Sequence, residues 1–433
     1  MLTIQIFIDF QWVDAATVHV NDVSRGGVRS GSVFAYEPLY AMGSYHPVSL
    51  NFPVTMMEDI LTTWPALLYD LIPQGNGRKY LLGELEMNDG ESANFSLLKA
   101  GAFNPIGRLR IKESVDFYHA YVDQHDTDQL QHGLKKDELL LNNPDFVERM
   151  HVHGMLASGT TGVQGAAPKF LLTQDDNGLW FADGQLQDAQ ARKHYIVKLP
   201  RGKTEADHKV LRNESAYMRV AKEMGLNATE GIEFDRGMLF IPRFDRNVID
   251  GRRVRYHQES LASVAGIAGY EYRPSQFELL DALRKVATRR QRETIEFMKR
   301  DVLNLAMKNT DNHARNTAVQ IRDGNIVLTP LFDFAPMYMD PEGIPRAARW
   351  NHPETKKEIH EWSEIIAVLE TNEKVSERLS AQEKDLVRSE LYEFGKKMES
   401  LEEIMRACHV EQDIIEFLRP AIKNQTNQLL ALH

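Results

Sequence analysis

The chain has 433 residues, of which 42% are hydrophobic and 26% are charged. This length predicts two or three core-forming units. The formal charge of −11 argues against a protein that coats nucleic acid by bulk electrostatics, although it leaves room for a local basic face.

The cysteine content and the apolar segments narrow the class further. The single cysteine, Cys408, excludes an internal disulfide and a zinc site built from several cysteines. No window approaches the roughly 20 apolar residues of a membrane-spanning helix. The N-terminus lacks the basic region and the long apolar core of a signal peptide. These features predict a cytoplasmic protein.

The first third of the chain favours strands at its start and helices later. Alternating apolar residues predict strands at Ile4 to Ile8, Thr17 to Val20 and Ser32 to Tyr36. Helical spacing predicts a helix over Met57 to Leu71, closed by a turn at Gly75-Asn76-Gly77. A second helix is predicted from Asp137 to Met150.

The middle third alternates glycine-rich loops with strands. One helix is predicted from about His208 to Met224, where apolar residues recur at helical spacing. The predicted strands are Lys169 to Thr173, Leu179 to Ala182, Tyr195 to Leu199 and Met238 to Pro242.

The last third is predicted to be helical apart from one hairpin. That hairpin pairs Thr317 to Ile321 with Ile326 to Thr329 across a turn that contains Asp-Gly, a strong turn signal. A cluster of basic residues favours a solvated helix face, with a contact surface for DNA or a protein partner as the alternative. The cluster comprises Arg284, Lys285, Arg289, Arg290, Arg292, Lys299 and Arg300.

A strand-rich part followed by a helical part predicts an α+β fold with two lobes and ATP in the cleft. The N-terminal lobe would span residues 1–245, with a β-rich subdomain at about 1–115 and an ATP-lysine sheet at about 150–245. The helical C-terminal lobe would span 246–433 and carry the catalytic loop.

The chemistry centres on a polar loop that is followed by a second carboxylate. Asp311 and Asn316 are five residues apart, and Asp333 follows after the hairpin. Phosphoryl transfer needs one carboxylate to orient the attacking hydroxyl and accept its proton, and an Asn and a second Asp to hold magnesium. The helix before the loop carries an apolar stripe that holds the loop in place, formed by Ile295, Met298, Val302 and Leu305. The alternative for each polar residue alone is a turn or a cap.

Lys198 lies within an apolar strand, where an unpaired ammonium is costly. A phosphate and a carboxylate would remove that cost, and Glu214 on the next helix is the favoured carboxylate, with Glu205 and Glu230 nearby. The alternative is an edge-strand lysine that reaches solvent. Upstream, the glycine-rich residues 159–167 could bring backbone N–H groups close to phosphate oxygens, or form an ordinary loop.

In order along the chain, these motifs resemble those of HipA-type serine/threonine kinases, the toxins of bacterial toxin-antitoxin pairs. The matching segments are Tyr45 to Leu50, Asp70 to Gly75, Gly162 to Gln164, Pro168-Lys169, Ile196 to Pro200, Asn213-Glu214, Arg243 to Arg246, Gln258-Glu259, Asp311 to Asn316 and Leu331 to Asp333. The resemblance implies an ATP- and Mg²⁺-dependent kinase that phosphorylates a translation component, such as an aminoacyl-tRNA synthetase, and arrests growth. It also implies a small helix-turn-helix antitoxin that restrains the kinase and recruits it to operator DNA.

The resemblance assigns roles to single residues. Asp311 is the catalytic base, and Asn316 and Asp333 are the metal ligands. The residues assigned to ATP are Lys198, Phe244, Gly162, Val163, Gln164, Glu214 and His313.

This sequence departs from the family pattern in three places. Residues 165–167 are inserted in the phosphate loop, and Pro242 replaces a hinge residue that is often acidic. Gly159 stands where family members carry the serine that they autophosphorylate, so Ser158 and Thr160 are the candidate substitutes.

Two other functions fit parts of the pattern. One is a catalytically weak kinase-like module that acts only as the corepressor partner of a DNA-binding protein. The other is a metal hydrolase that uses Asp311, His313 and Asp333, but it leaves Lys198 and the glycine-rich loop without a role. His151 and His153 are read as an ordinary exposed pair.

Overall fold

The computed structural model describes residues 1–433 except 44–45, 125–132, 141–168, 184–185 and 187–188. The chain divides into two compact units, each built from two segments. The first unit comprises Met1–Arg201 and Met238–Glu271, and the second comprises Gly202–Gly237 and Tyr272–His433. The predicted lobe boundary at residue 245 stays a prediction.

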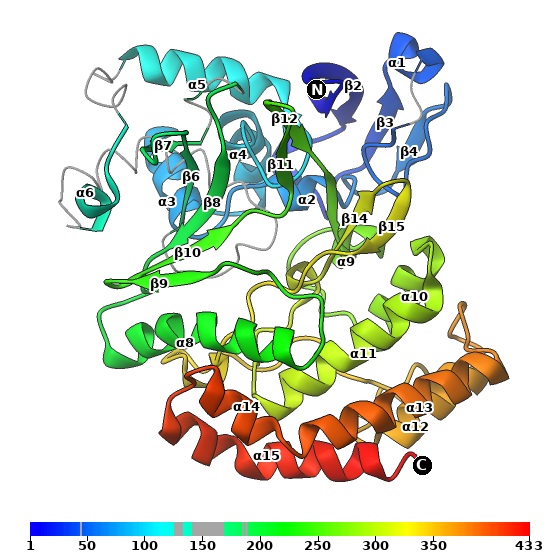
Figure 1. The fold of residues 1–433 in the computed structure, drawn as a ribbon. Coiled ribbons are helices and arrows are strands. Elements are labelled where there is room, and N and C mark those ends of the chain that lie inside the picture. Colours follow the sequence, from blue (N-terminus) through cyan, green and yellow to red (C-terminus); the bar gives the residue numbers. More distant parts are fainter. Residues whose placement is uncertain (44–45, 125–132, 141–168, 184–185, 187–188) are drawn as a thin grey trace. The chain divides into compact units, whose positions relative to one another are not determined.

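The first unit begins with an antiparallel sheet of strand order β4-β3-β2-β1-β5 (Figure 1). Its inward side chains, such as Ile4 and Phe34, form one apolar core with residues of the helices that follow, such as Leu97 and Tyr121. The strands are β1 (Leu2–Ile8), β2 (Gln11–Val20), β3 (Ser32–Tyr36), β4 (Asp59–Leu61) and β5 (Leu109–Ile111). The helices are α1 (Pro38–Gly43), α2 (Leu68–Leu71), α3 (Gly75–Glu84), α4 (Asn94–Gly101) and α5 (Lys112–Gln124).

A second antiparallel sheet of the first unit runs in the order β7-β6-β8-β10. Trp180, Val197 and Phe240 fill its core. The strands are β6 (Lys169–Gln174), β7 (Trp180–Ala182), β8 (Lys193–Lys198) and β10 (Met238–Pro242). The remaining elements of this unit are α6 (Lys136–Leu140), the hairpin of β11 (Arg246–Ile249) with β12 (Arg252–Arg255), β13 (His257–Ser260) and α9 (Leu261–Val264).

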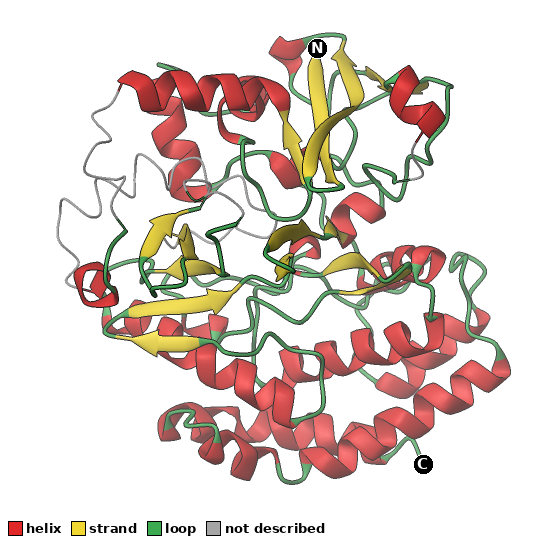
Figure 2. Ribbon diagram, turned by 45° about the horizontal axis from the view of Figure 1, so that its top comes forward, coloured by secondary structure: helices red, strands yellow, loops and turns green. Residues whose placement is uncertain are grey.

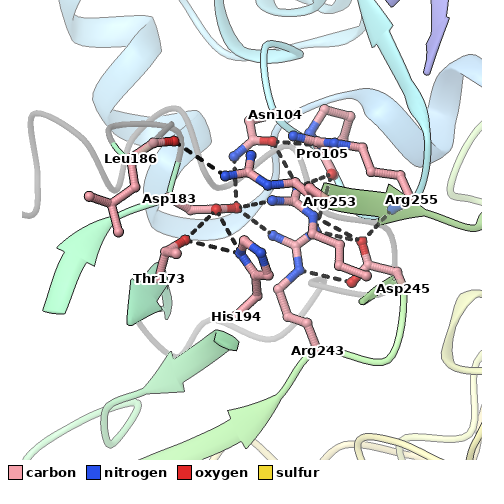
Figure 3. Close-up of polar contacts among 12 residues, drawn as sticks. Asn104, Pro105, Thr173, Asp183, Leu186, His194, Arg243, Asp245, Arg253 and Arg255 are labelled. Carbon is pink, nitrogen blue, oxygen red and sulfur yellow. Dashed lines mark hydrogen bonds and ion pairs between the residues drawn. The ribbon is translucent and has the colours of Figure 1, made fainter. Parts of the chain in front are cut away.

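A buried cluster of charges ties this sheet to the hairpin (Figure 3). Asp183 accepts hydrogen bonds from Arg243 at 2.8 Å, from Arg246 at 2.5 Å and from Asn104 at 2.8 Å. Arg243 also forms a bidentate pair with Asp245, at 2.8 and 2.6 Å. The side chains of these ion pairs are at most 2% exposed. Such buried charges are tolerated because each carboxylate meets several donors.

The same cluster holds more arginine than carboxylate among the described residues. Arg255 donates to Asn104 at 2.9 Å, and its guanidinium carbon lies 4.9 Å from the ring centre of Trp12 and 5.4 Å from that of Phe7. Aromatic faces attract a desolvated cation, so the two rings partly replace an acidic partner in stabilising the Arg255 guanidinium. Burial, followed by repulsion from Arg246 and Arg253, holds the pKa of Arg255 well below its usual value.

The second unit is mostly helical (Figure 2). Three of its helices begin with a capping box, at Thr204 with Asp207, Ser275 with Glu278 and Ser380 with Glu383. The helices are α8 (Glu205–Glu223), α10 (Gln276–Val286), α11 (Arg290–Ala306), α12 (Trp362–Thr371), α13 (Ala381–Met398), α14 (Leu401–Ala407) and α15 (Gln412–Leu430). The strands are β9 (Glu233–Asp235) and the hairpin of β14 (Ala318–Arg322) with β15 (Asn325–Leu328).

The α+β class predicted from the sequence is confirmed, and β3 and β10 have the predicted bounds. The hairpin is also confirmed, with Arg322 paired to Asn325 and with Asp323 and Gly324 at φ values of +49° and +74°. These positive values are those of a tight two-residue turn. The predicted helix from Asp137 to Met150 is seen only as α6, and residues after 140 lie outside the described residues.

The predicted helix over Met57 to Leu71 is wrong. Residues 59–61 form the edge strand β4, and only Leu68–Leu71 are helical, because Pro65 has no N–H to donate within a helix. The predicted turn at Gly75 to Gly77 is also wrong, since α3 begins at Gly75. Arg78 of that helix is bonded to Asp89 and Asn94, which anchors α3 to the segment that follows.

The predicted solvated basic face is wrong at two of its seven residues. Arg284 is buried and donates to the Glu377 carbonyl at 2.8 Å and to Thr294 at 2.8 Å. Arg300 is buried as well and donates to Glu296 and to the carbonyl of Thr329. These two arginines therefore hold helices and loops together instead of facing a partner.

We expect Asp183→Asn to lower the free energy of unfolding by about 3–5 kcal/mol, because it leaves two buried guanidinium groups without their shared carboxylate. Urea unfolding followed by tryptophan fluorescence measures this loss. Asp176→Asn is the matched control, since Asp176 pairs with Arg192 at the surface and should cost about 1 kcal/mol or less. Equal losses for the two variants would contradict the role given to Asp183.

We also expect stability to fall as the pH drops from about 6.5 to 4. Burial lowers the pKa of His194 to about 4 despite the nearby Asp183, so on acidification the unfolded chain takes up this proton first. Each pKa unit is worth about 1.4 kcal/mol, which gives a loss of up to about 3 kcal/mol. Urea unfolding at several pH values tests this, and His194→Gln should flatten the profile above pH 4. Asp245, whose pKa is about 2 because Arg243 and Arg246 outweigh burial, adds a further loss only below about pH 4.

Candidate active site

The polar loop from Asn309 to Asn316 follows α11 directly. Phe297, Met298, Val302 and Leu303 bury one side of this helix. Lys308, at φ +49°, adopts the left-handed conformation that commonly ends a helix. The loop therefore starts at the end of a packed helix, as the sequence predicted. Ile295 and Leu305 of the predicted apolar stripe are only partly buried.

Asn316 closes the loop onto Asp311. Its Nδ2 donates to the backbone carbonyl of Asp311 at 2.7 Å, and this contact assigns the orientation of the amide. The Oδ1 atom of Asn316 is buried and finds no hydrogen-bond donor among the described residues. A buried oxygen of this kind is costly unless it binds a ligand or water. It is also the hard donor that Mg²⁺ prefers, so it fits a magnesium ligand.

His313 lies beside the carboxylate of Asp311. Its Nδ1 accepts a hydrogen bond from the backbone N–H of Arg315 at 3.3 Å, and its Nε2 lies 3.7 Å from Oδ1 of Asp311. With Nδ1 as an acceptor, a neutral imidazole carries its proton on Nε2. That N–H lies near the Asp311 carboxylate but beyond hydrogen-bond distance from Oδ1.

Asp333 follows the β14–β15 hairpin in a strained backbone conformation, with φ +55°. The next residue, Phe334, is buried and packs on Tyr217 of α8 at a ring distance of 5.3 Å. The hydroxyl of Tyr217 donates to the carbonyl of Met307 at 3.2 Å. Helix α8 therefore holds Phe334 and the end of α11 together.

Asp311, Asn316 and Asp333 line one cavity of about 30 Å³. About 10–15 Å³ suffices for one water molecule, so the cavity has room for a small ion or water. Asn309 lines it too and donates to Asn304 at 3.0 Å and, at 3.5 Å, to the carbonyl of Asp333. The described residues hold no group of three or more His, Cys, Asp or Glu side chains suited to a metal ion. A magnesium ion here would rely on Asn316, Asp333 and ligand oxygens, as phosphoryl-transfer sites do.

The family model of the HipA-like C-terminal domain matches residues 161–413, which is more than half of the chain. The chain belongs to the HipA-like family. The resemblance predicted from the sequence is therefore confirmed.

The fold of the whole HipA-like chain matches a solved structure from Shewanella oneidensis MR-1, in which HipA is bound to HipB and its operator DNA. The match has a TM-score of 0.64 and 17% identity, and it covers 100% of this chain and 96% of that one. The proinflammatory kinase CtkA of Helicobacter pylori matches at a TM-score of 0.37, 14% identity, and 55% and 89% coverage, which is too weak to support an argument. No curated protein matches the sequence.

The remaining predicted site residues of this HipA-like chain are spread over both units. Lys198 is buried on β8 in register with Leu239, and Phe244 is partly buried after β10, both in the first unit. Glu214 is buried on α8 in the second unit. Gly162, Val163, Gln164, Ser158, Thr160, His151 and His153 lie outside the described residues. The roles of Lys198, Phe244, Glu214 and residues 162–164 toward ATP stay predictions, as do autophosphorylation at Ser158 or Thr160 and the exposure of His151 and His153.

Two segments near the N-terminus that match the family pattern contact residues 259–260, which contain or adjoin a third such segment, within the first unit. Asp70 accepts hydrogen bonds from the N–H and hydroxyl of Ser260 at 2.9 and 2.7 Å. Glu259 accepts from the hydroxyl of Ser49 at 2.6 Å and from the N–H of Leu50 at 2.8 Å. These segments are some 190 to 210 residues apart in sequence, so their pairing gives the family pattern a structural role.

Asp301 and Asn312 also line the cavity, and no sequence pattern predicted them as site residues. Asp301 is 2% exposed on α11, next to the apolar residues Val302 and Leu303. A carboxylate within such an apolar stretch is the signal that could have found it, because a buried charge needs partners.

We expect Asp333→Val to lower the free energy of unfolding by about 1–3 kcal/mol, because a β-branched residue is strained at positive φ. Asp333→Asn should change it by less than about 1 kcal/mol, since Asn tolerates this conformation. Thermal unfolding of the two variants measures the difference. An equal loss in both would show that the carboxylate, and not the backbone, dominates stability at this position.

Proposed function

We propose that this HipA-like chain is an ATP- and Mg²⁺-dependent serine/threonine protein kinase. The observation that carries the proposal is the loop itself, in which the Asn316 amide is bonded to the Asp311 backbone and Asn316 lines one cavity with Asp311 and Asp333. This is the residue order and chemistry of a phosphoryl-transfer site.

In the proposed mechanism, Asp311 orients the serine or threonine hydroxyl of the acceptor and takes its proton as the oxygen attacks the γ-phosphorus of ATP. The bond from that phosphorus to the bridging oxygen breaks, and ADP leaves. His313 lies beside this carboxylate, with its Nε2 at 3.7 Å from Oδ1 of Asp311. Asn316 and Asp333 are the residues that would hold magnesium, which screens the phosphate charge when bound. In this proposal Lys198 contacts the ATP phosphates, with Glu214 as its carboxylate partner. Phe244 lines the adenine pocket.

The wider role follows from family membership. We propose a cytoplasmic toxin that phosphorylates a translation protein, such as an aminoacyl-tRNA synthetase, and arrests growth. The Shewanella structure, which contains HipB and operator DNA, supports a helix-turn-helix antitoxin as the partner and corepression of the operon as a second role. Autophosphorylation at Ser158 or Thr160 belongs to the same proposal. No helix in the described part of the chain is long and apolar enough to cross a membrane.

We expect Asp311→Asn to lower phosphoryl transfer by about 10²- to 10⁴-fold while nucleotide affinity changes little, because the carboxylate acts on the acceptor hydroxyl. Transfer of labelled γ-phosphate into protein measures the first quantity, and a thermal shift with Mg²⁺ and a non-hydrolysable ATP analogue measures the second. Asp323→Asn is the matched control, since its turn accepts Asn and lies outside the cavity.

The same assay separates the alternatives. Transfer by the wild type that Asp311→Asn abolishes supports the kinase. Absence of transfer from either protein would favour a kinase-like module that acts only as the partner of a DNA-binding protein. Release of free phosphate without labelled protein would favour a metal hydrolase.

A further inference from the structure

Asn312, the residue after Asp311, bonds its side chain to a distant backbone segment. Its Oδ1 accepts hydrogen bonds from the N–H of Ala347 at 3.0 Å and of Ala348 at 3.3 Å. Its Nδ2 donates to the carbonyl of Ala348 at 2.8 Å. Asn312 is 8% exposed, so water competes little for these three contacts. The side-chain amide therefore bonds to the backbone of this segment through both an acceptor and a donor, as the backbone of a neighbouring strand would.

Asp301 holds the same segment from the helix beneath. Its carboxylate accepts from Nη2 of Arg346 at 2.8 and 2.6 Å and from the indole N–H of Trp350 at 2.8 Å. A third donor, Nε2 of Gln276 on α10, reaches it at 3.0 Å. The ring of Trp350 packs against Phe277 at 4.9 Å. Residues 346–350 are thus bonded at both ends and in the middle to the elements that line the cavity.

The position of this segment restricts what can approach Asp311. Because Asn312 follows Asp311 and bonds to Ala347 and Ala348, the backbone at 347–348 lies one side chain away from the loop that carries the carboxylate. The Arg349 side chain, between the anchored residues, is 44% exposed. One side of the segment therefore faces the loop and another faces solvent. Ala347 and Ala348 are therefore direct neighbours of the loop that a polypeptide must reach to present a hydroxyl to Asp311.

We propose that Asn312 and Asp301 are positioning residues that hold residues 346–350 as a wall of the polypeptide-acceptor site. This inference rests on the proposed kinase function. Neither residue needs to touch the reacting atoms. Their loss should weaken productive binding of a protein acceptor while leaving the nucleotide affinity intact.

Limited proteolysis of the full-length chain tests the anchoring without any assumption about activity. Trypsin can cut after Arg346 and Arg349, and it does so only when the segment opens locally. We expect Asn312→Ala and Asp301→Asn to raise the rate of these two cuts by about 10- to 100-fold, because each removes several hydrogen bonds. Asn312→Asp keeps the acceptor for both N–H groups and should be intermediate. Asn325→Ala, which removes a single exposed turn contact, is the matched control and should cut like the wild type.

Steady-state kinetics tests the acceptor role. Dephosphorylated casein serves as the protein acceptor, and ATP hydrolysis without casein gives the reference rate. For Asn312→Ala we expect kcat/KM for casein to fall at least about tenfold, mainly through KM. The loss of kcat/KM for casein should exceed any loss in the rate of hydrolysis without casein, because Asn312 also lines the cavity and a change in the cavity alone would lower both rates equally. Partial recovery in Asn312→Asp, which retains two of the three contacts, supports positioning.

The outcomes distinguish the two proposals. If the wild type phosphorylates casein and Asn312→Ala is cut faster without a change in KM for casein, the contacts are structural and the positioning role is wrong, whereas the kinase stands. If neither the cuts nor the KM change, the anchoring itself is wrong. If the wild type labels neither casein nor any protein of a bacterial lysate, the kinase function fails, and the acceptor wall fails with it.

Discussion

The candidate site depends on one buried carboxylate, that of Asp301. A charge at 2% exposure is unstable in a folded protein unless hydrogen-bond donors surround it. Gln276, Arg346 and Trp350 supply them, from α10 and from a segment about 45 residues away. The position of that segment, and with it the surroundings of the loop from Asn309 to Asn316, thus follows from the need to neutralise one side chain of α11.

The first unit uses the same device around Asp183. Its carboxylate is met by Asn104, Arg243 and Arg246, which come from segments 60 to 79 residues distant in sequence. The arginines of the motif at 243–246 therefore act as structural cations, which explains why Phe244, between them, is only partly buried while both arginines are fully enclosed. In both units the hydrogen bonds to one buried carboxylate, together with the apolar core, determine which distant segments contact each other.

The sequence predicted features that depend on neighbours in the chain. The strands β3 and β10 and the Asp323-Gly324 turn follow from alternation and from residues that accept positive φ. A long helix was wrongly predicted for residues 57–71 because their apolar spacing is helical. Pairing with β3 and the proline at 65 prevent that helix. The order of the motif predicted that Asp311, Asn316 and Asp333 act together, and these three residues line one cavity. Asn312 and Asp301 were missed because their partners lie 25 to 49 residues away, and no local pattern records such contacts.

The amide of Asn316 serves both the conformation of the loop and the chemistry proposed for the cavity. The Nδ2 group is used inside the protein, where it holds the carbonyl of Asp311. A carboxylate at this position would place a negative oxygen against that carbonyl and add a third charge to a cavity that already holds those of Asp311 and Asp333. The amide avoids both problems, because its nitrogen bonds to the loop and its other end is a neutral oxygen. The loop can therefore keep its conformation whether or not a cation is bound, which is what a preorganised site requires.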